Sequence, residues 1–162
     1  SQYLVEHRQK LAAYLTEQLQ EIDGLTPPEI REGCTHDFTI YAISYDAGKI
    51  GIHRDEFCEM LEAEGMKCED TSQWHVPPFY GKFVPPIHLQ PIFTKKTFRP
   101  KGYPWTCEHY NGQVSYGMGT LPVVERIGKE EIICITALYP PLTTDDMDDF
   151  INAFKKIIRL CK

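Results

Sequence analysis

Apolar residues recur at helical spacing near the start of the chain. The series consists of Leu4, Leu11, Leu15, Leu19 and Ile22. Its intervals of seven, four, four and three positions place these side chains on one face of a helix. Gly24 and the two prolines at 27–28 end that helix. No N-cap residue precedes it, so we expect a chain that continues upstream.

The segment 143–162 has the same periodicity and a complete set of helix signals. Its apolar stripe consists of Met147, Phe150, Ile151, Phe154, Ile157 and Ile158. Thr143 or Thr144 can cap the first free N–H groups. Aspartates fill the first turns and basic residues the last, as the helix dipole favours. We therefore predict a helix packed by this stripe.

Strand patterns lie between these two helices. Residues 36–46 alternate and are rich in Thr, Ile, Tyr and Phe, which predicts a strand, and residues 131–138 form a short apolar run typical of a buried strand. Residues 54–65 predict a helix that ends at Gly65 and packs through Phe57, Met60 and Leu61, and 66–69 is a short strand candidate. The expected fold class is α+β, with helices and strands packed in two layers.

Residues 71–120 differ from both flanks. They hold ten of the 19 aromatic residues and seven of the 12 prolines. Their net charge is +4, whereas the rest of the chain carries −10. A long, stiff, aromatic and basic segment suggests a ligand-binding surface for an anion in a ring-lined pocket. The competing interpretation is that this proline-rich segment only wraps around the sheet and that its lysines are simply solvated.

Within this segment, the stretch FVPPIHLQPIF (83–93) places His88 between apolar neighbours and prolines. Prolines restrict the backbone and can pre-orient the imidazole as a donor for a carboxylate or phosphate. The alternative is a buried histidine satisfied by the core. His75, in WHVPPF, has a similar but weaker setting of apolar neighbours and prolines, which we call a proline frame, and the remaining histidines lack one. The run 107–109, Cys-Glu-His, is not spaced as a metal site.

Length, net charge and cysteine content narrow the class of protein. The length of 162 residues suits one domain, and the net charge of −6 argues against nucleic acid as a partner. Six cysteines are scattered singly, which favours a reducing compartment and free thiols. There is no signal-peptide pattern and no apolar run long enough to cross a membrane, so we expect a cytoplasmic protein.

Several stretches, in order, resemble one known family. GIHRDEFCEMLEAEGMKCE, VPPIHLQPIF and LPVVERIGKEEIICITALYPPLTTDDMDDFINAFKKI look like the C-terminal part of a DegT/DnrJ/EryC1/StrS aminotransferase. The order of motifs is kept from about residue 3 to 160. That family uses pyridoxal 5'-phosphate in the fold-type-I architecture.

The resemblance implies that 1–162 is a single C-terminal small domain: a small antiparallel sheet packed against helices, with a long Pro/aromatic-rich loop region. It implies that a large domain upstream carries most of the cofactor site, including the Schiff-base lysine. No residue of this chain is expected to be catalytic, and the fragment alone is expected to be inactive. The complete protein would be a homodimer.

The implied reaction moves an amino group from glutamate or glutamine to a keto sugar, often nucleotide-linked, or to a keto-cyclitol. By position, His88 matches the family's active-site histidine and is expected to bind substrate. The substrate-binding candidates are His88, His75, Tyr80, Phe93 and Lys95. Glu125 and Arg54 are expected to be structural.

Two stretches, 65–88 and 94–121, are longer than the family pattern, so His75 could be the matching histidine. The other hypothesis is a stand-alone, non-catalytic domain that binds a ligand or protein through residues 71–120.

Overall fold

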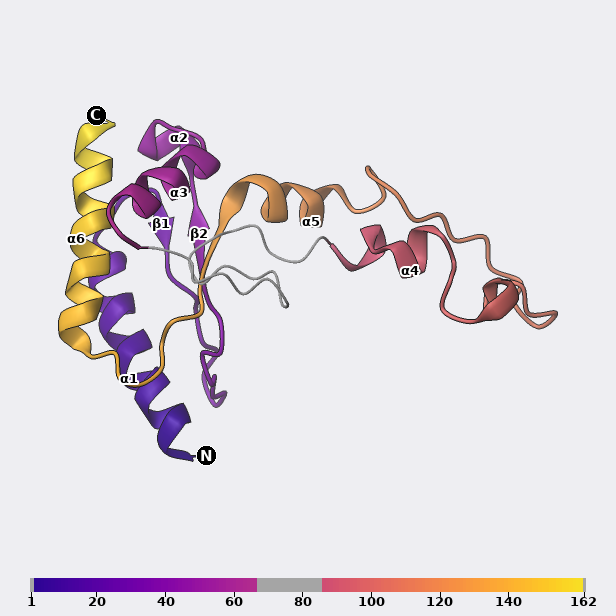
Figure 1. The fold of residues 1–162 in the computed structure, drawn as a ribbon, viewed down its shortest axis with the longest axis horizontal. Coiled ribbons are helices and arrows are strands. Elements are labelled where there is room, and N and C mark those ends of the chain that lie inside the picture. The colour runs from indigo at the N-terminus through magenta and orange to yellow at the C-terminus, as the bar shows by residue number, and fades with distance from the viewer. Residues whose placement is uncertain (1, 67–85, 162) are drawn as a thin grey trace.

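The first and last helices, α1 (Gln2–Leu19) and α6 (Thr144–Leu160), lie side by side against one face of a small sheet (Figure 1). The computed structural model describes residues 2–66 and 86–161. Helix α1 buries Leu11, Ala12, Leu15 and Leu19, and α6 buries its predicted stripe together with Ala153. Both helices predicted from apolar periodicity are confirmed, and their apolar faces form much of the core.

The sheet has three antiparallel strands in the order β1 (Leu25–Thr26), β2 (Tyr41–Tyr45) and β3 (Ile132–Ile135). Tyr41 pairs with Ile135, Ile43 with Ile133, and Leu25 with Tyr45. These six side chains are buried. Because β-strand side chains alternate between faces, this register places all six on the same side of the sheet.

Strand β2 starts later than the sequence predicted. The expected strand began at position 36, but a local turn occupies the residues before Tyr41. In that turn the backbone N–H of Phe38 donates to His36 Nδ1 (2.9 Å) and that of Thr39 donates to Asp37 Oδ1 (3.2 Å). Phe38 also has a positive φ of 49°, which a strand does not permit. In this segment, side-chain hydrogen bonds thus replace the backbone hydrogen bonds that would pair the strand with its neighbour.

Two helices follow β2. The first is a one-turn helix, α2 (Ala47–Ile50), which begins with the Asp46 carboxylate accepting from the N–H groups of Gly48 and Lys49. Helix α3 (Arg54–Ala63) lies within the predicted range. Its Phe57 ring packs between Tyr45 and Phe154, with centroids 5.2 and 5.3 Å away. The strand candidate at 66–69 lies almost entirely outside the described residues.

The N-cap of α6 is Thr143, which resolves the choice between the two threonines. Its backbone N–H and its hydroxyl both donate to the Asp146 carboxylate, at 2.7 and 2.9 Å. These two hydrogen bonds lower the pKa of Asp146, the backbone one most. The capping box fixes where the chain turns from the sheet layer into α6.

Between residue 86 and β3 the chain runs out and back as a projection, which we call the arm (residues 86–121; Figure 1). Its outward limb contains η1 (Ile87–Leu89), α4 (Pro91–Thr94) and η2 (Pro100–Gly102). The chain then returns through α5 (Pro122–Arg126) and a π-helical turn, η3 (Ile127–Glu131), into β3. The predicted α+β class with a long irregular region is confirmed.

Candidate functional site

His88 lies in η1, a 3₁₀ helix of one turn, between Pro86 and Pro91. The turn is closed by hydrogen bonds from Leu89 N to the Pro86 carbonyl (2.7 Å) and from Gln90 N to the Ile87 carbonyl (3.1 Å). Neighbouring side chains on such a turn point in different directions. Accordingly, Ile87 is 74% exposed while His88 is only 6% exposed. The proline frame therefore holds the imidazole inward, as its sequence context suggested.

The partner of His88 is Glu125, which lies on α5, 37 positions along the chain. The Nε2 atom of His88 is 2.8 Å from Glu125 Oε1. The same carboxylate accepts hydrogen bonds from the backbone N–H groups of Gly119 (2.8 Å) and Leu121 (3.2 Å). The Gly119 N–H, and after it the His88 ring, lower the pKa of Glu125. Glu125 is therefore a carboxylate that accepts from Nε2–H and fixes the ring.

The second ring nitrogen of His88, Nδ1, is buried without a hydrogen-bond partner among the described residues. With Nε2–H donated to Glu125, a neutral ring leaves a lone pair on Nδ1, and a protonated ring leaves an N–H there. An unsatisfied buried polar atom is costly and uncommon in folded proteins. The geometry thus leaves His88 able to bind one more polar atom.

An apolar cavity of about 440 Å³ lies next to this pair. Ile87 and Leu89, the neighbours of His88, line it together with Glu125, and the remaining lining residues are Pro86, Met118, Val124, Ile127, Gly128, Lys129 and Ile132. His88 itself does not line this cavity. Apolar walls with a few polar groups are typical of small-molecule sites.

Arg54 holds the opposite wall of this cavity in place. Its guanidinium, 3% exposed, donates from Nη1 to the carbonyls of Ile132 (3.0 Å) and Gly128 (3.3 Å). It also donates from Nη2 to the carbonyl of Lys129 and pairs with Asp55 at 2.9 Å. A π-helical turn leaves carbonyls without regular partners, and Arg54 satisfies them. This agrees with the structural role expected for Arg54.

Phe93 and Lys95, the two other predicted site residues that the structure describes, do not line the cavity beside His88 and Glu125. Phe93 packs inside the arm against Trp105 and Tyr116, with centroids 6.3 and 5.5 Å away, and Trp105 Nε1 donates to the Tyr116 hydroxyl (3.2 Å). Lys95 is exposed on the loop after α4. His75 and Tyr80 lie outside the described residues.

Sequence reasoning missed the pairing of His88 with Glu125 and the cavity side chains Met118, Val124 and Lys129. No local pattern signals a contact between an irregular turn and a short helix so far apart in the chain. Only the family resemblance drew attention to Glu125, and it did so without giving a partner.

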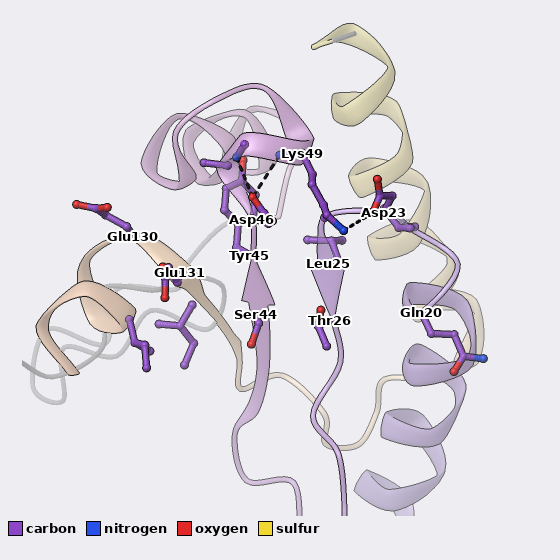
Figure 2. Close-up of a pocket in the computed structure, with 16 residues that line it drawn as sticks. Gln20, Asp23, Leu25, Thr26, Ser44, Tyr45, Asp46, Lys49, Glu130 and Glu131 are labelled. Atoms are coloured by element: carbon purple, nitrogen blue, oxygen red, sulfur yellow. Dashed lines mark hydrogen bonds and ion pairs between the residues drawn. The ribbon is translucent and has the colours of Figure 1, made fainter. Parts of the chain in front are cut away.

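A larger cavity of about 670 Å³ lies between the sheet, α2 and η3 (Figure 2). Its charged side chains are already paired. Lys49 contacts Asp23 at 2.8 Å, Glu131 contacts Arg126 at 2.6 Å, and Glu130 contacts Lys129 at 3.2 Å. Asp46 is engaged in capping α2. These contacts account for the charged side chains of the cavity as local structural interactions.

The described residues do not fit a pyridoxal phosphate site. Every lysine in the two described ranges is exposed, except the half-buried Lys155 on α6. A lysine that binds a carbonyl group needs a depressed pKa and an enclosed setting. Within the same ranges no three His, Cys, Asp or Glu side chains cluster as metal ligands, and no helix is long and apolar enough to cross a membrane.

Comparison with known proteins gives consistent results. The sequence model of the DegT/DnrJ/EryC1/StrS aminotransferase family matches residues 2–139. The uncharacterised protein MJ1066 of Methanocaldococcus jannaschii is 26% identical over 94% of the chain. A protein of Streptomyces kanamyceticus, with the provisional name L-glutamine:3-amino-2,3-dideoxy-scyllo-inosose aminotransferase, is 29% identical over 90% of the chain. The chain spans about a third of the length of each, 32%.

Two solved structures share the fold. A structure of DesI in the presence of its TDP-sugar product superposes on 96% of the chain and 31% of its own, with a TM-score of 0.62 and 18% identity. The aminotransferase TlmJ from Streptoalloteichus hindustanus superposes on 98% of the chain and 32% of its own, with a TM-score of 0.56 and 18% identity. The small sheet with its helices therefore occurs as one part of larger chains.

Proposed function

The chain belongs to the DegT/DnrJ/EryC1/StrS aminotransferase family, and we propose that it forms the substrate-side small domain of a sugar or cyclitol aminotransferase. The amino donor would be glutamate or glutamine, and the acceptor a keto sugar or a keto-cyclitol. The family match over 2–139 supports the reaction class. A non-catalytic binding domain is the less favoured alternative.

The observation that carries this proposal is the His88–Glu125 pair. Glu125 fixes the imidazole through Nε2, and the unpartnered Nδ1 remains for a ligand atom. Because the ring is held by both a proline frame and a carboxylate, little conformational freedom is lost when substrate binds. Ile87 and Leu89, the chain neighbours of His88, line the cavity, and we place the substrate there.

Pyridoxal phosphate would supply the electron sink of the reaction when bound. We propose that a large domain elsewhere in the complete protein holds it, because the described lysines are too exposed for that role. Residues 1–162 alone would then bind no cofactor and transfer no amino group. The complete enzyme would act as a homodimer, as the resemblance implies, and in the cytoplasm, as the scattered single cysteines suggest.

The acceptor belongs to one of two chemical classes. The Streptomyces relative is named for a scyllo-inosose, a cyclitol, and for L-glutamine as donor. DesI was crystallised with a TDP-sugar product. Assays of the complete protein with glutamine and glutamate, against a keto-cyclitol and a nucleotide-linked keto sugar, distinguish these acceptors. If no combination of these donors and acceptors gives turnover, the proposed function is contradicted.

The role of His88 is tested by His88→Ala in the complete protein. Loss of one hydrogen bond to a charged or polar substrate group costs about 1.5–3 kcal/mol, so kcat/KM should fall roughly tenfold to a hundredfold. The matched control is His109→Ala, because His109 lies on the arm with its side chain 85% exposed. If His88→Ala leaves turnover intact and His75→Ala abolishes it, His75 is the functional histidine.

A further inference from the structure

The returning limb of the arm contains the dipeptide Asn111-Gly112, the one Asn-Gly pair in the sequence. Both residues are exposed and belong to a stretch, 110–116, that lies outside the helices and strands (Figure 1). Asn-Gly pairs commonly form tight turns between strands, where both residues take a positive φ. Neither residue has a positive φ here, so this pair is not held in such a turn.

The peptide nitrogen of Gly112 and the side-chain amide of Asn111 are both left to solvent. Within the described parts of the chain, the Gly112 N–H donates no hydrogen bond and the Asn111 carboxamide has no hydrogen-bond partner. An amide that is bonded inside a helix or sheet becomes available only after local opening of the fold. The Asn111-Gly112 pair needs no such opening.

The ring of Tyr110 lies where a side chain at position 112 would be. A Cβ at this position would lie 2.9 Å from Tyr110 Cζ and from Tyr110 Oη, closer than Cβ atoms approach other atoms in proteins. A larger residue would therefore have to displace the ring, whereas glycine leaves room for it. As a result, no side chain at position 112 shields the peptide nitrogen next to Asn111.

We infer that Asn111 is a site of spontaneous deamidation, which produces aspartate and isoaspartate in the arm. Asparagine is one of the thermolabile residues of proteins. The Gly112 nitrogen forms a bond to the side-chain carbonyl carbon of Asn111, and the bond from that carbon to the NH2 group breaks. The NH2 group leaves as ammonia with the proton of the peptide nitrogen. Water then opens the resulting succinimide ring at either of its two carbonyls, so the reaction requires no oxidant and no cofactor.

The modification changes both the shape and the charge of the arm. Asn111 lies between Trp105 and Tyr116 along the chain, and the side chains of these two residues share a hydrogen bond of 3.2 Å. Isoaspartate adds one carbon atom to the main chain within this segment. Both products add a carboxylate, and Glu108 is the one acidic residue in the sequence of the arm. Each event therefore doubles the number of negative charges on the arm. The inference does not depend on the proposed function.

The test is peptide mapping by mass spectrometry of the complete protein, incubated at mildly alkaline pH both folded and in urea. Asn152 is the matched control in the same molecule, because it is exposed on α6 and is followed by Ala153, whose N–H lies inside the helix. Unfolding should speed deamidation of Asn152 at least about tenfold, since that site reacts only when α6 opens. The rate at Asn111 should differ by less than about threefold between the folded and the unfolded protein.

The variant Asn111→Gln identifies the modified residue. Glutamine would have to close a six-membered ring, which forms more slowly than the five-membered succinimide, so this peptide should keep its mass in the variant. The melting temperature should not change, because the side chain is exposed. Deamidation of Asn111 at least about tenfold slower in the folded protein than in urea would overturn the inference, because the site would then be shielded. A wild-type peptide that gains no more mass than that of Asn111→Gln would overturn it as well.

Discussion

The core and the arm are stabilised in opposite ways. Every buried hydrophobic residue among the described residues lies between 11 and 66 or between 133 and 158. In the arm the only buried side chain of the described residues is that of His88. Meanwhile Ile87 and Met118, both large and apolar, are 74% and 73% exposed. The core buries apolar side chains, whereas the arm buries a polar one and exposes apolar ones.

This difference shows what each region is suited for. Apolar burial gives most of the stability of a domain, so α1, α6 and the sheet form a scaffold. The arm is shaped by prolines, by the half-buried trio Phe93, Trp105 and Tyr116, and by the link from His88 to Glu125. Regions with little buried apolar surface are the ones that open locally, and binding sites are commonly found there.

The largest expected effect tests the core side of this comparison. Phe154 on α6 is 1% exposed and packs on Phe57. Phe154→Ala leaves a cavity and should lower the free energy of unfolding by about 3–5 kcal/mol, measured by urea unfolding.

The arm counterpart of this test is Met118→Ala, because Met118 is 73% exposed. Its cost should be below about 0.5 kcal/mol. Comparable losses from Phe154→Ala and Met118→Ala would mean that the arm is covered by other parts of the protein and contributes to stability as the core does.

The second-largest expected effect concerns the hydrogen bonds by which Arg54 connects the core to the chain that returns from the arm. Arg54→Met keeps the volume of the side chain but removes the donors to the carbonyls of Gly128, Lys129 and Ile132. Leaving these carbonyls without their donors should cost about 3 kcal/mol in unfolding free energy.

The control for Arg54 is Arg126→Met, an exposed arginine whose ion pair with Glu131 lies on the surface. Surface ion pairs contribute about 0–1 kcal/mol. Equal effects of the two substitutions would show that η3 holds its conformation without Arg54.

The same contrast explains what could be predicted from the sequence. The helices α1, α3 and α6 and the strands β2 and β3 were predictable because their periodic apolar residues are the ones that the core buries. The arm has no such period, since its apolar side chains are not buried together, so α4, α5 and η3 gave no signal. Asp46 and Thr143 illustrate intermediate cases, where capping residues mark helix starts locally.

Prediction of the site was limited in the same way. His88 could be found from its proline frame, which is local in sequence. Its partner Glu125 could not, because the contact joins two irregular segments through hydrogen bonds that follow no repeat. Phe93 packs in the arm's aromatic trio, and its role in binding substrate stays a prediction.

The smallest expected effect concerns the pH dependence of the arm. Hydrogen bonds from Gly119 N–H and from His88 lower the pKa of Glu125 in the folded chain. A carboxyl whose pKa is lowered by folding stabilises the fold fully above its unfolded pKa, about 4.3, and loses this contribution as pH falls through the lower folded value. Glu125→Gln removes the titration, so wild type and variant should differ near neutral pH and converge below pH of about 4.

We expect the arm, which buries little apolar surface, to open without the core. Amide hydrogen exchange of Gly119 and Leu121, whose N–H groups donate to Glu125, is therefore a sharper measurement than global unfolding. At each pH the rate in Glu125→Gln is divided by the rate in wild type, which cancels the intrinsic pH dependence of exchange. The ratio should exceed one near pH 6 and approach one as the carboxylate of wild type is protonated. Glu108→Gln, with its side chain 84% exposed on the same arm, should leave the ratio at one throughout. A Glu125 ratio that stays constant with pH would mean that the charge of Glu125 does not hold the base of the arm, and that the prolines around His88 suffice.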